Sequence, residues 1–277
     1  VEEQVFLEFH LNVTYNKEQI RKRLRRNEET MKKRTAIVTG ASGDIGGAIA
    51  ERLAADGYHL VLIGNKSKER LLEVADKCRE YAGQSGKTIF SMTGDLGEYT
   101  AAEVLLAEAI ERLQQVDLLV NCAGMAHIGL LADMSHDEWN NVLNTNLSSV
   151  FYCCRAVVPS MVRRKCGHIL NISSVWGSVG ASCEVAYSAT KGAIHSLTKG
   201  LAKELAPSNI AVNALACGMI DTKMNDCFSK HEIAHICDEI PAGRMGTPAE
   251  VAEAIALLAE APIYLTGQII TMDGGWC

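Results

Sequence analysis

The stretch TAIVTGASGDIGGAIAERL at residues 35–53 joins a short apolar, β-branched run to a helical pattern through Gly40, Gly43 and Gly46. The first part predicts a buried strand, and the spacing of apolar residues in the second predicts an amphipathic helix. A glycine turn in this setting is typical of a dinucleotide-binding loop, because a helix start offers free N–H groups and partial positive charge to phosphate. Asp44 is unexpected in such a loop, although an acid in the first helical turn suits the helix dipole.

The same alternation of strand and helix continues along the chain. Apolar strands are predicted at 35–40, 59–64, 87–95, 117–124, 167–174, 210–218 and 267–275, and helices at 44–57, 68–83, 101–116, 137–164, 185–206 and 248–260. Continuous apolar strands between amphipathic helices indicate a parallel sheet that is buried on both faces. We therefore expect an α/β fold of the single-domain Rossmann type. It has a doubly wound, mostly seven-stranded parallel sheet with helices on both faces, and functional residues that follow the strands.

Composition narrows the class of protein. The 277 residues carry a net charge of −6 and are 48% hydrophobic, so a large core is available and no overall basic field favours nucleic acid. The ten cysteines form no C-x-x-C pair, which is typical of a reducing compartment, and no apolar stretch reaches membrane-spanning length. We expect a cytoplasmic protein without a nucleic-acid or membrane partner.

The beginning of the chain differs from the rest. The segment NKEQIRKRLRRNEET at residues 16–30 is charge-dense, whereas the sequence from Met31 onward is strand-like at once. Blocks of charge are typical of disordered chain, although a basic tail can also bind RNA or an acidic partner. A third interpretation, which we favour, is that Met31 is the natural start and that residues 1–30 are a non-native extension. The catalytic domain is then expected at residues 31–277.

The glycine loop and the end of the second strand together predict a cofactor. Gly40 permits a tight turn, Gly43 lets the backbone approach a pyrophosphate, and Gly46 lets the helix pack on the sheet; the alternative is a plain glycine-rich turn. The second strand is followed by GNKSK at residues 64–68, which contains no acid. Lys66 and Lys68 suit a 2′-phosphate, which favours NADP(H) over NAD(H), unless they are ordinary solvated charges at a helix start.

A second motif, YSATK at residues 187–191, predicts the chemistry. Tyr187 and Lys191 are four residues apart at a helix start and share one face. A nearby ammonium favours the phenolate, so we expect Lys191 to lower the pKa of Tyr187. Ser174 closes the fifth strand, where its hydroxyl can bind a developing oxyanion. The three residues suit the protonation of a ketone oxygen or the deprotonation of an alcohol.

These motifs resemble those of the short-chain dehydrogenase/reductases, over nearly all of residues 33–277. The likeness also rests on Asp95 after the third strand, NCAG at 121–124, NTNLSSVF at 144–151 and CGMIDT at 217–222. The resemblance implies that Ser174, Tyr187 and Lys191 are catalytic and that Asn146 completes a proton relay through a kinked helix and water. The cofactor-binding residues that it implies, with those of the glycine loop, are Gly40, Ser42, Gly43, Asp44, Ile45, Gly46, Asn65, Lys66, Asp95, Leu96, Asn121, Ala123, Gly124, Tyr187, Lys191, Gly218, Ile220 and Thr222.

The sequence departs from this family at several positions. The second glycine of the loop stands at Gly43, and Asp44 occupies its usual place. The arginine that often reads the 2′-phosphate is missing. Cys122 replaces an asparagine and Cys217 replaces a proline, and we expect both replacements to be tolerated.

The resemblance also suggests substrates. DEWNNVLNTNLSSVF, IPAGRMGTPAEVAEAIALLAE and YLTGQIITMDGG are similar to segments of 3-oxoacyl-[acyl-carrier-protein] reductases, and the basic residues Arg163, Arg164, Lys165 and Lys203 would suit an acidic acyl carrier protein. WGSVGASCEVAYS and the terminal GGWC resemble the reductase that acts on 5-aminopentanone-modified elongation factor P. Glu184, with Trp176, would then line the pocket and attract an amine. Sugar-alcohol and steroid dehydrogenases are lesser alternatives, and the resemblance implies a homotetramer packed through the helices at 137–164 and 185–206.

HEIAH at residues 231–235 points to a different class of enzyme. On a helix, His231 and His235 would share a face for zinc, with Glu232 as a base and Glu250 or Glu253 as a third ligand. The motif is short and lies in the segment that would cover the substrate of a reductase. We therefore predict no metal site and keep a zinc metallopeptidase as the alternative.

Overall fold

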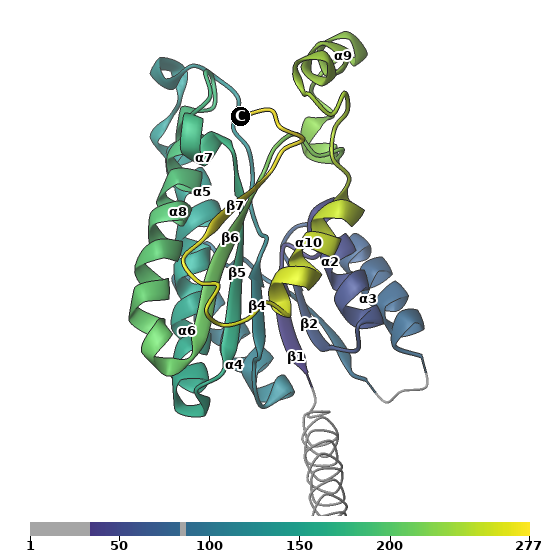
Figure 1. Ribbon diagram of the computed structural model, residues 1–277, viewed down its shortest axis with the longest axis vertical. Coiled ribbons are helices and arrows are strands. Elements are labelled where there is room, and N and C mark those ends of the chain that lie inside the picture. The colour runs from purple at the N-terminus through teal and green to yellow at the C-terminus, as the bar shows by residue number, and fades with distance from the viewer. Residues whose placement is uncertain (1–33, 84–86) are drawn as a thin grey trace, which may run out of the picture. The chain divides into compact units, whose positions relative to one another are not determined.

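Seven parallel strands form one sheet, in the order β3-β2-β1-β4-β5-β6-β7, in the computed structural model, which describes residues 34–83 and 87–277 (Figure 1). The strands are β1 (Thr35–Thr39), β2 (His59–Gly64), β3 (Ile89–Thr93), β4 (Leu118–Asn121), β5 (Gly167–Ser174), β6 (Ile210–Cys217) and β7 (Ile269–Met272). The order of the strands reverses between β1 and β4, the kind of position at which doubly wound folds bind ligands. The predicted Rossmann architecture is confirmed.

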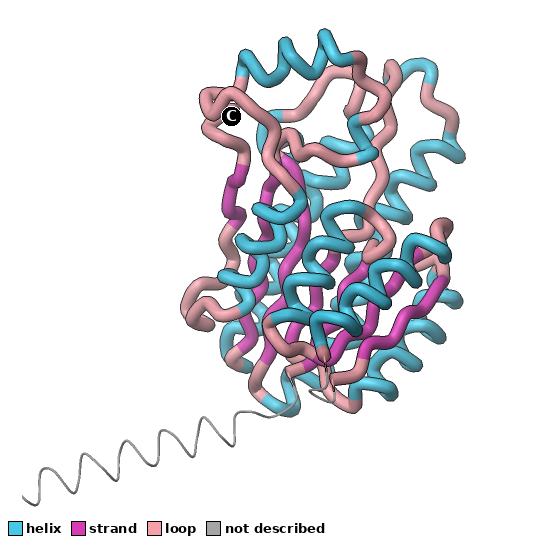
Figure 2. The backbone as a smooth tube through the Cα atoms, turned by 90° about the vertical axis from the view of Figure 1, so that its right-hand side faces the viewer, coloured by secondary structure: helices cyan, strands magenta, loops and turns pink. Residues whose placement is uncertain are grey.

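Helices cover both faces of the sheet (Figures 1 and 2). One apolar layer joins the sheet to α2 (Asp44–Ala55), α3 (Lys68–Ala82) and α10 (Pro248–Ala259). The other joins it to α4 (Tyr99–Leu113), α6 (Ser149–Arg164) and α8 (Val185–Leu205). Because both faces are covered, every residue of β1 and β6 is buried, as the continuous apolar strands predicted. Residues 35–277 form one compact unit, and the predicted boundary at residue 31 lies outside the described residues.

The predicted helix at 137–164 consists of three parts. α5 (His136–Leu143) is followed by a single π-helical turn, η2 (Asn144–Ser148), and then by α6. The wider turn re-aims the side chains that it carries, and such turns are frequent at functional sites. Asn146 lies in the middle of this turn and is 1% exposed. The π turn interrupts the helix that the spacing of apolar residues predicted as continuous, and it lies where the family resemblance implied a kink.

Short elements that the sequence did not predict lie in the connections between the strands and the longer helices. They include η1 (Leu131–Asp133), α7 (Trp176–Val179), η3 (Ala206–Ser208), η4 (Lys223–Asn225) and α9 (Lys230–Glu239). α7 and α9 stand beyond the carboxyl edge of the sheet (Figure 1). α9 carries a short apolar stripe of Ile233, Ile236 and Cys237, which are half-buried, and none of its residues is fully buried. No helix in the two described ranges is long and apolar enough to cross a membrane.

Candidate active site

The glycine loop lies between β1 and α2 and touches the segment that follows β4. Gly40 has a φ of +66°, and a Cβ built on it would lie 2.7 Å from the Ala123 Cα, so only glycine fits this turn. A Cβ on Gly46 would collide with the Gly40 carbonyl oxygen. Gly46 thus allows the loop to close on itself, whereas the sequence predicted a contact between helix and sheet. The Thr39 hydroxyl accepts hydrogen bonds from the N–H groups of Cys122 and Ala123, at 3.0 and 3.2 Å.

The start of α2 fits a pyrophosphate. Gly43 is the N-cap residue and has no side chain to occupy the first N–H groups, which lack acceptors inside a helix. Asp44 and the half-buried Ile45 form the first turn. Ser42 lies against the end of β2, since a Cβ on Gly64 would be 3.1 Å from its Oγ. The loop therefore has the form of a dinucleotide turn with displaced glycines.

The predicted adenosine-side residues follow β2 and β3. Asn65 and Lys66 are exposed directly after β2. Asp95 is exposed after β3, and its Oδ1 accepts the Gly97 N–H at 2.8 Å, while Leu96 is buried in the core. The exposed groups of Asn65, Lys66 and Asp95 thus stand at neighbouring strand ends, where a nucleoside can reach them.

Asn121 is buried at the end of β4. It is 3% exposed, and its amide donates to the Asn171 Oδ1 at 2.8 Å, while the Asn171 amide donates to the Thr198 hydroxyl at 2.9 Å. This buried network joins β4 and β5 to α8. The side chain of Asn121 is thus turned into the core, where its Oδ1 has no hydrogen-bond partner among the described residues, and its predicted contact with the cofactor stays a prediction.

The three residues after β6 that were predicted to bind the cofactor differ in their surroundings. Gly218 makes room for the chain that follows β7, since a Cβ there would be 2.7 Å from the Asp273 Cβ. Ile220 is 5% exposed and packs in the core. Thr222 is half-buried, and its hydroxyl donates to the Ile220 carbonyl at 3.3 Å. Of the three, Thr222 alone offers a polar side chain to a ligand.

The structure brings Ser174, Tyr187 and Lys191 together at the carboxyl edge of the sheet. Ser174 ends β5, and its hydroxyl lies close enough to the phenol of Tyr187, near the start of α8, to lower the pKa of that phenol. The Lys191 ammonium lies 5.4 Å from the centre of the Tyr187 ring and donates to the Ile172 carbonyl at 3.0 Å. An ammonium has three donors, so Lys191 retains donors for a ribose hydroxyl.

The expected lowering of the pKa of Tyr187 by Lys191 is not what the structure shows. Burial raises the pKa of the phenol well above its ordinary value, and the hydrogen bond with Ser174 lowers it only in part. The Lys191 ammonium is directed to the Ile172 carbonyl and lies over the ring. Burial likewise lowers the pKa of Lys191. Tyr187 is consequently a neutral phenol at neutral pH, which suits a proton donor.

Asn146 and Lys191 lie on either side of Gly124. A Cβ built on Gly124 would be 3.5 Å from the Asn146 Oδ1 and 3.6 Å from the Lys191 Nζ. The Asn146 side chain accepts from the Met125 N–H at 2.8 Å and donates to the Met125 carbonyl at 2.9 Å and the Thr190 hydroxyl at 3.2 Å. These bonds show that Asn146 fixes the chain after β4 against α8, and the proton relay through it stays a prediction.

The two cysteines that depart from the family pattern lie near these groups. Burial raises the pKa of Cys122 and of Cys217 to about 12. Both side chains are therefore neutral thiols at neutral pH and act as small apolar groups beside Lys191.

Glu184 and two indoles form one wall next to Tyr187. The ring centres of Trp176 and Trp276 are 5.1 Å apart, so the end of the chain returns to α7. Burial raises the pKa of Glu184, a hydrogen bond from Trp176 lowers it, and the charge of Glu184 in turn raises the pKa of Tyr187. The sequence predicted Glu184 and Trp176 but missed Trp276, because no local pattern tells that a terminal residue contacts α7.

The basic residues predicted to meet a carrier protein lie at the other edge of the sheet. Arg164 donates to the Asp117 carboxylate at 2.7 Å and also to the Val116 carbonyl, just before β4 begins. Lys203 is about 24 Å along α8 from Tyr187, at roughly 1.5 Å per residue. Helices that return antiparallel to the strands place these charges far from the carboxyl edge, and a carrier contact by these residues stays a prediction.

The HEIAH segment has a structural explanation. Glu232 and Ser229 form a capping box at the start of α9, in which the Glu232 carboxylate accepts the Ser229 N–H at 2.7 Å. His235 lies 3.7 Å from Glu239 on the exposed helix. Within the described ranges, no three His, Cys, Asp or Glu side chains are grouped as metal ligands. Glu232 is thus occupied as a helix cap.

Comparison with known proteins identifies the family. The sequence model of the short chain dehydrogenases matches residues 34–233. The oxidoreductase YmfI of Bacillus subtilis (strain 168) is 43% identical over 244 residues, which cover 88% of this chain and 98% of that protein. The 3-oxoacyl-[acyl-carrier-protein] reductase FabG of Salmonella typhimurium is 39% identical over 241 residues, which cover 87% of this chain and 96% of FabG.

A solved structure has the same fold. A crystal structure of a variant of actinorhodin polyketide ketoreductase with NADPH superposes with a TM-score of 0.81 at 33% identity, over 88% of this chain and 97% of that one. The extent of these matches agrees with the arrangement of glycine loop, serine, tyrosine and lysine described above. The chain therefore belongs to the short-chain dehydrogenase family of oxidoreductases.

Proposed function

We propose that this protein catalyses the NADP(H)-dependent reduction of a ketone to a secondary alcohol. The observation that carries the proposal is the grouping of Ser174, Tyr187 and Lys191 at the carboxyl edge of the sheet, beside the glycine loop. Tyr187, a neutral phenol, donates a proton to the carbonyl oxygen, and Ser174 stabilises the charge that develops there. Lys191 holds the nicotinamide ribose, and Asn146 completes the proton relay. Bound NADPH supplies the hydride for the carbonyl carbon.

NADP(H) is favoured over NAD(H) by the residues after β2. Asn65 and Lys66 are exposed there, and no acid stands in the GNKSK segment to repel a 2′-phosphate. The polyketide ketoreductase that shares the fold was solved with NADPH. Both observations support a phosphorylated cofactor.

The substrate that the relatives suggest is a 3-oxoacyl group on acyl carrier protein. FabG, at 39% identity, carries that activity in its name. Since Arg164 and Lys203 lie far from Tyr187, docking of a carrier would have to use residues at the carboxyl edge.

A second substrate is favoured by Glu184. Its half-buried carboxylate acts on the phenol that donates the proton and interacts with Trp176, whose ring packs on that of Trp276. A desolvated carboxylate beside aromatic faces attracts an ammonium group and does not suit a neutral acyl chain. We therefore include the reduction of the 5-aminopentanone group on elongation factor P as the alternative.

The deciding experiment measures NADPH oxidation with acetoacetyl-acyl carrier protein and, in parallel, with aminopentanone-modified elongation factor P. Turnover of either ketone supports the reductase, and the ratio of the two kcat/KM values identifies the substrate class. Absence of turnover of both ketones, and of small neutral ketones, would contradict the proposal.

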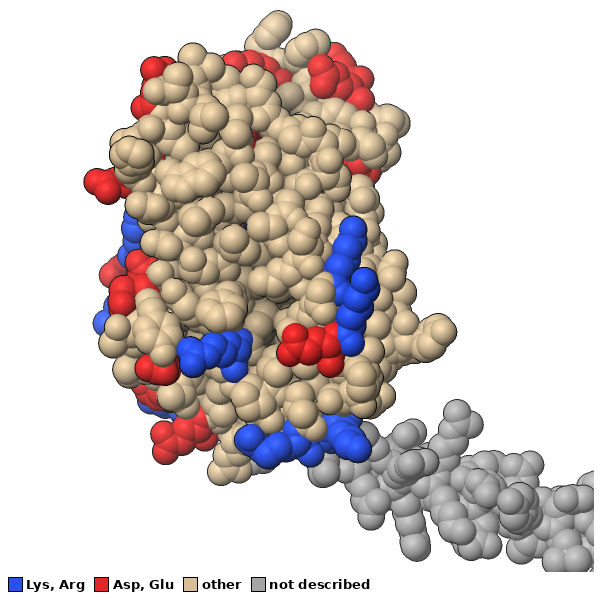
Figure 3. Space-filling view, turned by 90° about the vertical axis from the view of Figure 1, so that its left-hand side faces the viewer, with Lys and Arg blue, Asp and Glu red and all other residues tan. Residues whose placement is uncertain are grey.

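We further propose a homotetramer. α6 leaves Phe151 and Val162 exposed, at 50% and 37%. The face drawn in Figure 3 shows almost no charged side chains over its upper middle, while Lys, Arg, Asp and Glu stand at its edges and across its lower part. Such a surface suits association with further copies of the chain, and sedimentation velocity tests it.

A further inference from the structure

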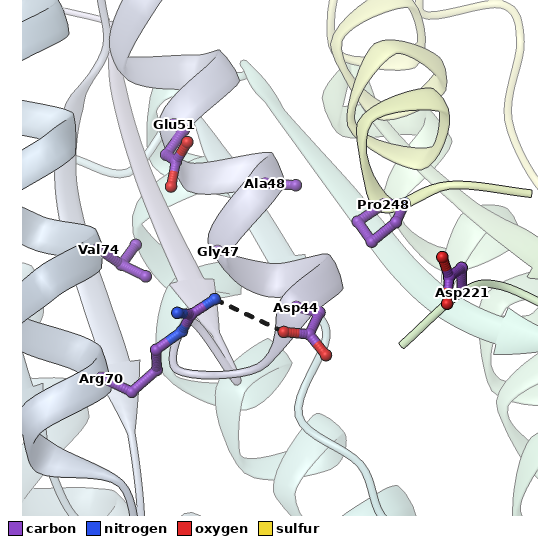
Figure 4. A pocket seen from close by; sticks show the side chains of 8 residues that line it. All are labelled: Asp44, Gly47, Ala48, Glu51, Arg70, Val74, Asp221 and Pro248. Carbon is purple, nitrogen blue, oxygen red and sulfur yellow. Dashed lines mark ion pairs between the residues drawn. The ribbon is translucent and has the colours of Figure 1, made fainter. Parts of the chain in front are cut away.

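Asp44, which stands where the family has a glycine, joins two distant parts of the chain. Its Oδ2 accepts the backbone N–H of Lys223 at 2.8 Å, across 179 residues of sequence. Its Oδ1 lies 3.6 Å from the guanidinium of Arg70 on α3 (Figure 4). The first turn of α2 is thereby connected both to α3 and to the segment that follows β6.

The segment after β6 depends on contacts at its base. It leaves the sheet after Gly218, carries η4 and α9, and returns through a bridge between Ile220 and Gly246. None of the residues of α9 is fully buried, and the buried apolar side chains of the segment, Ile220 and Ile240 at 5% and 3% exposed, lie outside this helix near the base. A part of a protein with few buried contacts opens easily, and each hydrogen bond at its base then matters more. Thr222, one of the residues expected to bind the cofactor, directly precedes Lys223.

We propose that Asp44 is a positioning residue, whose carboxylate fastens the segment after β6 to the glycine loop. The bond places Thr222 beside the cofactor loop before a cofactor binds. A contact between Thr222 and the cofactor rests on the proposed function, whereas the hydrogen bond between Asp44 and Lys223 does not. Asp44 is compatible with an anionic cofactor because the Arg70 guanidinium balances its negative charge. The side chain of Arg70 is 41% exposed, so this ion pair contributes little to the stability of the fold.

A simple role at the helix dipole makes a different prediction. The dipole favours the negative charge of Asp44, so asparagine would lose that effect as alanine does. The bond to Lys223 needs only an acceptor oxygen, which asparagine keeps. The pair Asp44→Asn and Asp44→Ala therefore separates the two roles.

The experiment measures hydrogen exchange of the Lys223 amide in the cofactor-free protein. Asp44→Ala should accelerate exchange about tenfold or more, since the acceptor of the Lys223 N–H is lost, and Asp44→Asn, which keeps an acceptor oxygen, should stay within about threefold of the unmodified protein. Asp56→Ala, which removes the 3.0 Å ion pair with Arg52 at the other end of α2, is the control and should change nothing at Lys223. Should Asp44→Ala fail to fold, Asp44→Gly restores the residue of the family and equally lacks the acceptor.

Equilibrium binding completes the test. Asp44→Ala should bind NADPH at least about threefold more weakly than Asp44→Asn, because the two variants have lost the same charge and differ in the bond to Lys223. Exchange in Asp44→Ala as slow as in the unmodified protein, or exchange in Asp44→Asn as fast as in Asp44→Ala, would overturn the proposal. Failure of the unmodified protein to bind NADPH would instead contradict the proposed function, and the exchange result would still decide the role of Asp44.

Discussion

The ionisation of the Tyr187 phenol is favoured by the Ser174 hydroxyl and opposed by the Glu184 carboxylate. The hydrogen bond with Ser174 lowers its pKa, the charge of Glu184 raises it, and burial outweighs both. A neutral phenol is the form needed to protonate a ketone, and a carboxylate next to it is suited to a positively charged substrate. At the scale of single residues, Glu184 therefore decides between the two proposed substrates.

Glu184→Gln keeps the shape of the side chain and removes its charge. For an amino-ketone substrate, kcat/KM should fall about tenfold or more, and for a neutral ketone of similar length it should barely change. Burial raises the pKa of Glu184 above the ordinary range of glutamate. As the pH drops through that raised pKa, the carboxylate is protonated, and kcat/KM for the amino ketone should fall. Glu184→Gln should not show this fall at low pH. Glu204→Gln, near the other end of α8, is the matched control. Equal losses with charged and neutral ketones would show that Glu184 only holds its loop.

Among the elements, the glycine loop and the turn after β2 carry the cofactor site. Gly40 and Gly243 have similar φ angles, +66° and +70°, yet a Cβ on Gly40 would meet the Ala123 backbone whereas one on Gly243 meets nothing within 4 Å. Gly40→Ala should therefore lower the free energy of unfolding by about 1–3 kcal/mol more than Gly243→Ala does, as measured by urea denaturation. Equal costs would mean that the loop shifts freely away from β4.

The turn between β2 and α3 should determine the choice of cofactor. Replacing Lys66 and Lys68 together by alanine removes charge-assisted contacts to the 2′-phosphate. NADPH binding, followed by fluorescence titration, should weaken about tenfold, while NADH binding should stay within about twofold. An unmodified protein that already prefers NADH would show that this turn does not read a phosphate.

On the scale of the whole molecule, the strands were predictable and several contacts were not. β5 and β6 lie where their apolar runs placed them, and Ser174, Tyr187 and Lys191 meet because parallel strands all end at one edge. The spacing of apolar residues did not predict the π turn around Asn146, because one extra residue in a single turn barely changes that spacing along an otherwise continuous helix. The contact between Trp176 and Trp276 is set by the path of the whole chain.

The position of the basic residues is also a property of the whole fold. Arg163 and Lys203 are exposed toward the amino edge of the sheet, opposite Tyr187. Replacing both by glutamine should therefore leave kcat/KM for acetoacetyl-acyl carrier protein, and its dependence on salt, unchanged within about twofold. A large, salt-sensitive loss would show that a carrier docks at the amino edge.

The central claim is that Tyr187 gives the proton to a ketone that receives hydride from NADPH. Its most direct test uses NADPH that carries deuterium at the reactive C4 position. Mass spectrometry follows the transfer of this deuterium to the carbinol carbon of the alcohol. The unmodified protein and Tyr187→Phe are compared. We predict one deuterium in the alcohol formed by the unmodified protein. We also predict a rate at least about 10²-fold lower in the variant, with NADPH binding within about twofold. A Tyr187→Phe protein that transfers deuterium at nearly the original rate would contradict the claim.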